Sequence, residues 1–304
     1  MRIASLKIFI LIIFAFHNFA VVGQSKFNFY KYRKFYNQAE IAKYQKNYKA
    51  EKNYYEKAFK YMKQDYIVNL CYYQYVECLL NNKDTSAAII AEARYLAIGL
   101  INIESPKSIL RKFGTKYGSE LVNEFPKIKQ ESEKNPDKEN RLAIAELEKR
   151  DQEIRNEQSN MPREEWVKLL AFTDSTNFYD LFQLIKYKNA NPLCGLIYHL
   201  YGDNKKYFNY FDSVYKVKVY AGETTPEAYV QWHDRQRMYV NKMQTQLYGE
   251  WNDGANKNQF NPIEDIQNVD KRRAELGLCL LSDYTLLHNL ILPKDYPSTK
   301  NRKN

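Results

Sequence analysis

Apolar residues recur at helical spacing along most of this chain, and that spacing favours helices over a sheet. Glycine is scarce, at 10 of 304 residues, and no long run alternates apolar and polar side chains as a half-buried strand would. The sequence therefore predicts a mainly α fold. One exception is expected in 251–260, where the turn signal Asp253-Gly254 suggests a small β-hairpin.

The first 23 residues have the layout of a secretory signal peptide. Arg2 and Lys7 accompany an apolar run over 8–22, and the small or modest side chains that end at Gly23 favour a cut before Gln24. The run is shorter than the about 20 apolar residues of a membrane span. We expect an exported protein, periplasmic or extracellular, with no stable membrane span after cleavage. An uncleaved N-terminal anchor is the alternative.

Charge and cysteine usage exclude several classes of protein. The net charge is +10, but lysine is spread along the whole chain, so no nucleic-acid partner is expected. The cysteines form no Cys-x-x-Cys pair and have no histidine at a metal-site spacing, so we expect neither a metal nor a cofactor. Their apolar neighbours favour buried thiols for Cys71, Cys78, Cys194 and Cys279. A disulfide between Cys194 and Cys279 stays open for an exported protein.

Composition divides the chain into five parts. These are a signal peptide (1–23), helical hairpins (24–126), a charged linker (127–140), a C-terminal helical domain (141–292) and a tail (293–304). Ala58 and Ala93 lie 35 residues apart, and Tyr and Leu surround both. The stretch 24–126 thus resembles a degenerate tetratricopeptide array of about two repeats. That resemblance implies a concave surface for a protein or peptide partner; a generic helical bundle is the alternative.

Helix signals continue through the C-terminal domain. Thr225 is a good N-cap, Pro226 suits a first turn, and Gly249 marks the expected end of the clearest helix. A short helix that opens at 268 or 269 should stop at Gly277. The other expected helices cover 139–158, 162–172, 176–188, 192–201 and 204–221.

A carboxylate falls on the apolar face of the 139–158 helix. At about 100° per residue, Asp151 shares a stripe with Ile144 and Leu147. A buried carboxylate is costly unless it is paired, and Arg155 lies four residues further on, within reach. The pair is either a structural ion pair or part of a site.

The helix that starts at Thr225 also carries misplaced polar groups. Gln236 lies near the middle of its apolar face and His233 at the edge of that face. Arg235 and Gln246 line the opposite flank. Asp234 points away, either into solvent or into a second layer.

Motifs over about 146–285 resemble, in order, an uncharacterised bacterial family named domain of unknown function 6624. They are Arg150-Asp151-Gln152 with Arg155, Asp174 with Asn177, a helical His199, Asp234-Arg235, Gln246-Leu247-Tyr248-Gly249, the segment 269–278 and Tyr284. Glu250-Trp251 replaces the family's Thr-Gln, and Leu280 replaces a proline. The resemblance implies a shared domain and no particular reaction.

Three functions are compatible with these residues. The first is an exported binding protein, with a protein or peptide at the N-terminal hairpins and a small anionic ligand in a polar C-terminal pocket. The second is a metal-independent hydrolase with His199 or His233 as the base and Asp151 as its orienter. The third is a purely structural scaffold. The residues expected to bind the ligand are Asp151, Arg155, His199, Asp234, Arg235, Gln246 and Arg272.

Overall fold

The computed structural model describes residues 27–62, 69–84, 138–190, 205–240, 243–251 and 258–297, together with a few single residues between 87 and 133. This part of the chain is mainly helical, which confirms the predicted fold class. It contains no named strand, and an isolated parallel bridge joins Gln246 to Ile263. In the same residues no helix is both long and apolar enough to cross a membrane.

Several sequence predictions concern other residues. The signal peptide, most of the linker and the end of the tail lie outside the described residues. The same holds for the helix expected over 192–201, which carries Cys194 and His199, and for Asp253-Gly254. Cys279 is a free thiol, so it is not in the disulfide that the sequence left open.

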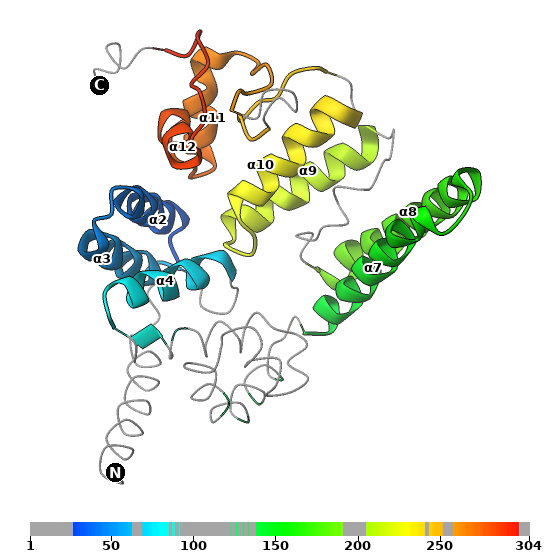
Figure 1. The fold of residues 1–304 in the computed structure, drawn as a ribbon, viewed down its shortest axis with the longest axis horizontal. Coiled ribbons are helices and arrows are strands. Elements are labelled where there is room, and N and C mark those ends of the chain that lie inside the picture. The colour runs from blue at the N-terminus through cyan, green and yellow to red at the C-terminus, as the bar shows by residue number, and fades with distance from the viewer. Residues whose placement is uncertain are drawn as a thin grey trace.

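Three N-terminal helices pack side by side (Figure 1, blue to cyan): α2 (Phe29–Tyr44), α3 (Tyr48–Phe59) and α4 (Asn69–Asn81). Asn28 and Asn47 cap α2 and α3, each accepting a hydrogen bond from a backbone N–H three residues further on. Small alanines allow close helix approach, and tyrosine rings fill the space around them. The buried core of this stack contains Tyr32, Tyr36, Ala39, Tyr55, Ala58, Met62 and Cys78.

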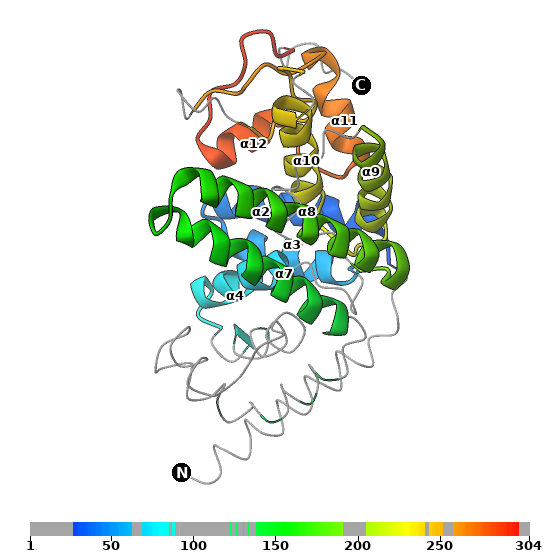
Figure 2. The same cartoon turned by 90° about the vertical axis from the view of Figure 1, so that its right-hand side faces the viewer.

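Helices α7 (Lys138–Asn156) and α8 (Arg163–Lys188) form a hairpin that extends from the rest of the molecule (Figures 1 and 2, green). The sequence predicted two helices where the structure has α8 alone. The polar interruption is absorbed because the hydroxyls of Ser175 and Thr176 donate to carbonyl groups four residues earlier in the same helix. Asp174 meanwhile forms an ion pair with Arg155 of α7.

A second hairpin joins α9 (Lys205–Tyr220) to α10 (Pro226–Arg235). The predicted start of α10 is confirmed, since Thr225 Oγ1 accepts a hydrogen bond from Ala228 N at 3.0 Å. The predicted end at Gly249 is wrong. The α-helix ends at Arg235, and a π-helical turn, η3 (Gln236–Val240), follows it directly.

The C-terminal helices α11 (Val269–Glu275) and α12 (Leu281–His288) meet α2, far away in sequence. The predicted stop at Gly277 is confirmed, and its φ of +66° suits glycine. Arg33 Nε and Asn37 Nδ2 of α2 both donate to the Gly277 carbonyl, at 3.1 and 3.0 Å. A Cβ at this position would lie 2.8 Å from Arg33 Cγ, so glycine also permits the close approach.

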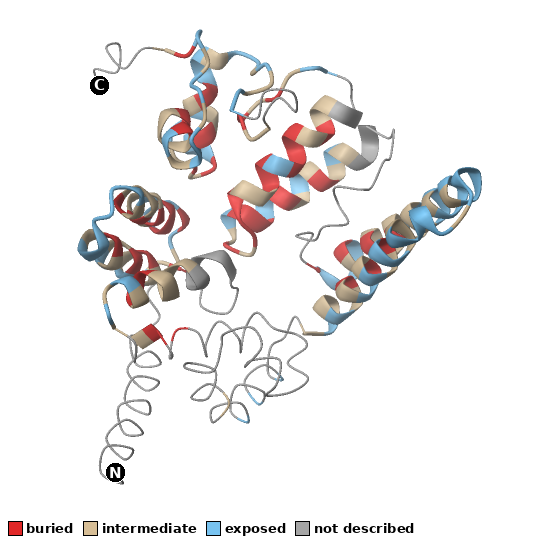
Figure 3. Ribbon diagram, viewed as in Figure 1, coloured by how far each residue is buried: buried red, intermediate tan, exposed pale blue. Residues whose placement is uncertain are grey.

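The main hydrophobic core draws on segments from both ends of the chain (Figure 3, red). Phe29 of α2 belongs to it, together with residues of α7, α8, α9 and α10. Trp232 lies at its aromatic centre, stacked on Tyr215 and Phe208 with ring centroids 5.5 and 5.4 Å apart. This core therefore joins helix α2 to helices α7, α8, α9 and α10.

Candidate functional site

Asp151 and Arg155 form an ion pair on α7, as the helix periodicity predicted. Asp151 is buried, and its carboxylate accepts hydrogen bonds from Arg155 Nε and Nη2 at 2.9 to 3.1 Å. Arg155 Nη2 also donates to Asp174 Oδ1 of α8 at 3.0 Å. This ion pair therefore connects the two helices of the α7–α8 hairpin.

A second group surrounds the loop at 246–248. Asp234 is fully buried, and its carboxylate accepts the backbone N–H groups of Leu247 and Tyr248 at 2.8 to 3.3 Å. The solvated alternative for Asp234 is therefore wrong, and the second-layer alternative is right. Arg272 Nε donates to the Leu247 carbonyl at 3.0 Å. Gln246 is equally buried, and its side chain bonds only backbone groups among the contacts described, at Trp251 and Asn261.

His233 lies inside a cage of aromatic rings. It is 6 % exposed, and its ring centroid is 5.3 Å from that of Tyr248 and 5.8 Å from that of Tyr229. Its Nε2 lies 3.8 Å from Asp212 Oδ1 and its Nδ1 lies 3.6 Å from Asp234 Oδ1, both beyond hydrogen-bonding range. Arg235 is half-buried on α10. One shared pocket for all predicted site residues stays a prediction, because His199 lies outside the described residues.

The sequence did not predict a role for the cluster around Arg273. This arginine is fully buried and donates to the carbonyls of Tyr248 and Cys279 and to Glu250 Oε1, at 2.7, 2.8 and 3.0 Å. Burial raises the pKa of Glu250 to about 7, although the nearby guanidinium opposes that rise. Burial also raises the pKa of the Cys279 thiol to about 11, so it is not a thiolate nucleophile at neutral pH.

These C-terminal clusters share one property: their charged side chains form hydrogen bonds with backbone groups or ion pairs with one another. Asp234, Arg272 and Arg273 together hold the loop at 246–248, which has little regular structure of its own. Such contacts satisfy buried polar groups and fix a loop. They favour a structural role for this set.

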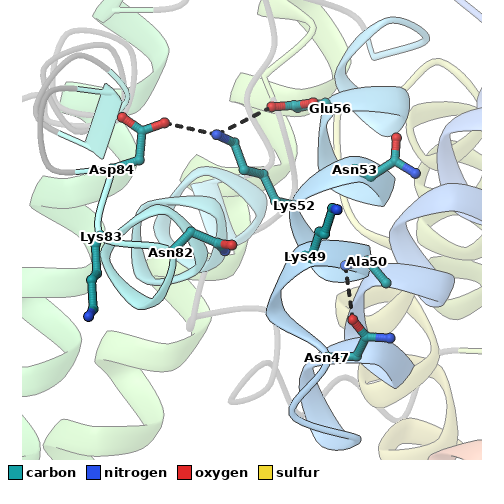
Figure 4. A pocket seen from close by; sticks show the side chains of 9 residues that line it. All are labelled: Asn47, Lys49, Ala50, Lys52, Asn53, Glu56, Asn82, Lys83 and Asp84. Carbon is teal, nitrogen blue, oxygen red and sulfur yellow. Dashed lines mark hydrogen bonds and ion pairs between the residues drawn. The ribbon is translucent and has the colours of Figure 1, made fainter.

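A pocket lies in the N-terminal stack, where the start of α3 faces the end of α4 (Figure 4). Its volume is about 950 Å³, and it is polar and largely open to solvent, as suits an extended ligand better than an enclosed small molecule. We call it the α3–α4 groove. It is lined by Asn47, Lys49, Ala50, Lys52, Asn53, Glu56, Asn82, Lys83 and Asp84.

Local hydrogen bonds fix the walls of the α3–α4 groove. Asn82 Nδ2 donates to the Tyr48 carbonyl at 3.0 Å, which ties the end of α4 to the start of α3. Asn47 caps α3 by accepting from Ala50 N at 3.2 Å. Lys83 has a φ of +60°, and this left-handed residue ends the helix and turns the chain. The groove is therefore formed by two capped helix ends.

The charges of the α3–α4 groove are only partly matched. Lys52 Nζ lies 2.8 Å from Asp84 Oδ2 and 3.9 Å from Glu56 Oε1 (Figure 4). The hydrogen bond between Lys52 and Asp84 raises the pKa of the lysine and lowers that of the aspartate, so both are ionised at neutral pH. The ammonium groups of Lys49 and Lys83 have no partner among the residues that the structure describes. The groove can thus offer two uncommitted cations to a ligand.

Glu51 lies beside the groove and differs from every other buried acid discussed above. It is 0 % exposed, and neither carboxylate oxygen accepts a hydrogen bond within the described residues. Burial raises its pKa to about 7, while Lys43 opposes the rise and Glu40 adds to it. The Cys78 thiol of α4 faces the carboxylate across the α3–α4 contact and, as a weak donor, also opposes the rise. A carboxyl group thus sits in a poorly solvated place between the helices that form the groove.

Comparison with protein-family models, with curated proteins and with solved structures gave no match for this chain. The tetratricopeptide-like array and the resemblance to domain of unknown function 6624 therefore stay predictions. The sequence analysis did not find the α3–α4 groove. The only available signal was the expected concave surface of the N-terminal hairpins, which named no residue.

Proposed function

We propose that this protein is an exported binding protein that holds an acidic segment of a protein or peptide in the α3–α4 groove. The observation that carries the proposal is the pair of unmatched lysines, Lys49 and Lys83, on the wall of a 950 Å³ cavity. A carboxylate placed there gains charge-assisted hydrogen bonds without breaking an existing ion pair.

The polar lining supports a peptide over an apolar small molecule. Asn53 is exposed and lines the same groove, where its amide can bond a peptide backbone (Figure 4). Lys52 is paired with Asp84, so it forms part of the groove wall and is not available to bind the ligand. Extended backbone with acidic side chains presents the donors, acceptors and negative charge that this lining can satisfy.

Binding can be measured by the fluorescence anisotropy of a labelled oligo-glutamate peptide. The matched probe is an uncharged glycine–serine peptide of equal length. We expect the acidic peptide to bind and Lys49→Gln/Lys83→Gln to weaken it about tenfold or more, which corresponds to about 1.4 kcal/mol. Raised salt should weaken the same complex, because the lysines are exposed.

The control is Lys34→Gln/Lys271→Gln, which removes the same charge from exposed sites on α2 and α11. Affinity equal to that of the unaltered protein is expected for it. If both double variants lose affinity equally, binding reflects net charge alone and the groove is not the site. If the uncharged peptide binds as tightly as the acidic one, the proposed ligand class is wrong.

The hydrolase alternative has less support. It needs a histidine that can reach a substrate, and His233 lies behind the rings of Tyr229, Trp232 and Tyr248. His199 lies outside the described residues. We therefore favour binding over catalysis.

A further inference from the structure

Helix α8 has two apolar faces, and within the described part of the chain only one of them packs against other helices. Its buried residues Asn177, Leu181 and Ile185 face the rest of the protein, where the Phe178 ring meets that of Phe211 of α9 at 5.8 Å. Residues on the opposite side, at about 100° per residue, form a second stripe. We call it the α8 outer stripe: Leu169, Phe172, Thr176, Tyr179, Gln183 and Tyr187.

The aromatic members of the α8 outer stripe are strongly exposed. Phe172 is 70 % exposed, Tyr179 62 % and Tyr187 68 %, and Leu169 adds 39 %. Several strongly exposed aromatic side chains on one helix face mark an interaction surface. Covering the stripe on two molecules would bury on the order of 1,000 Å² in total, the low end for a specific protein complex.

The charges at the ends of α8 identify the partner. Among the end charges of the helix, Glu165 and Lys186 lie on or beside the α8 outer stripe, seven residues before Phe172 and seven after Tyr179. Both side chains are exposed. A second α8 lying antiparallel brings each Glu165 towards a Lys186, whereas a parallel pair would bring like charges together.

The register follows from the same residues. Glu165, Phe172, Tyr179 and Lys186 follow one another at intervals of seven residues, so they form one row along the helix. An antiparallel pair centred between residues 175 and 176 therefore puts Glu165 beside Lys186 of the partner subunit. Phe172 of each molecule then meets Tyr179 of the other near the middle of the contact. The contact is self-complementary, as a two-fold dimer requires.

We propose that two copies of this protein associate through antiparallel packing of their α8 outer stripes. The contact is independent of the α3–α4 groove, which lies on other helices. Buried area does not by itself set the affinity, so self-association has to be followed over a wide range of protein concentrations.

Sedimentation velocity over roughly 1–100 μM tests the proposal on the whole protein. We expect a shift from monomer to dimer, and Phe172→Ser/Tyr179→Ser should weaken it about tenfold or more. Tyr44→Ser, at a 49 % exposed tyrosine on α2, is the matched control and should leave it unchanged. A monomer throughout, or an equal loss in the control, overturns the proposal.

Charge reversal tests the antiparallel register separately. Glu165→Lys and Lys186→Glu each place like charges at both ends of a homodimer, and each should weaken self-association about threefold or more. Mixing the two variants creates heterodimers in which both pairs are restored, so the mixture should associate as the unaltered protein does. No recovery on mixing rules out this register. Binding of monomers to lipid vesicles, lost in Phe172→Ser/Tyr179→Ser, would assign the stripe to a membrane surface instead.

Discussion

The α3–α4 groove and the loop at 246–248 use charge in opposite ways. Around the loop, Asp234, Arg272 and Arg273 are committed to backbone groups and to one another. At the groove, Lys49 and Lys83 have no partner among the described residues, and the buried Glu51 beside it forms no ion pair within them. Committed charges stabilise architecture, whereas uncommitted charges are available to a ligand or a proton.

The largest effect is expected at Arg273. Arg273→Met removes a buried cation, strands two carbonyl groups and leaves Glu250 without its guanidinium partner. Removing one partner of a buried pair costs about 3–5 kcal/mol in the free energy of unfolding. Urea unfolding followed by circular dichroism measures it.

The matched control for Arg273 is Lys271→Met, at an exposed position of the same helix. Its free energy of unfolding should stay within about 0.5 kcal/mol of the unaltered protein. A loss below about 1 kcal/mol for Arg273→Met would show that the loop holds without this network, and the proposed contrast between the two regions would fail.

The next effect is expected at Glu51, with a defined pH dependence. Its folded pKa of about 7 lies above the ordinary value of 4.5, so its contribution to stability is complete below about pH 4.5 and is lost as the pH rises towards 7. Glu51→Gln cannot ionise and avoids that loss. The variant should be more stable than the unaltered protein by about 2–3 kcal/mol above pH 7, and the difference should vanish near pH 4.

Thermal unfolding at several pH values measures the Glu51 effect. The informative quantity is the difference between Glu51→Gln and the unaltered protein, because the other ionisable groups around it, Glu40, Lys43 and Glu77, are present in both. A constant difference across pH 4–8 would mean that Glu51 ionises normally. The groove helices would then contain no uncommitted carboxyl group.

A smaller effect is expected for Asp151→Asn. The substitution keeps the side-chain shape but weakens the bidentate pair with Arg155, so we expect a loss of about 1–2 kcal/mol in stability. Peptide binding in the α3–α4 groove should not change. Asp180→Asn, in the half-exposed pair with Arg150, is the control and should cost less than about 0.5 kcal/mol. If Asp151→Asn abolishes binding while stability holds, the pair belongs to a ligand site.

Local pattern predicted what depends on neighbours in sequence. The mainly α class, the Thr225 cap, the stop at Gly277 and the inward Asp151 all follow from spacing along one helix. The predicted helix end at Gly249 is wrong. Asp234, near the actual end of α10, turns inward and binds the backbone of a loop that begins twelve residues later. The periodicity of a single helix cannot predict such a contact between a helix and a distant loop.

The groove shows the same limit for the site. Its walls come from α3 and from the turn after α4, and Asn82 joins them through the Tyr48 carbonyl across 34 residues. The pairing of Glu250 with Arg273 likewise spans 23 residues of irregular chain. In a single sequence these residues look like ordinary surface polar groups. Their roles depend on tertiary packing.

The smallest effect separates two lysines of the same groove. Lys52→Gln breaks the pair with Asp84 and should cost about 0.5 kcal/mol in stability, the usual value of a half-exposed ion pair. Lys49→Gln breaks no described contact and should leave stability unchanged within error. Acidic-peptide affinity should respond in the other order, falling more for Lys49→Gln because Lys49 is free to meet the ligand. If Lys52→Gln costs the greater share of affinity, the committed cation also recognises the ligand, and partnering within the protein would no longer distinguish architecture from function.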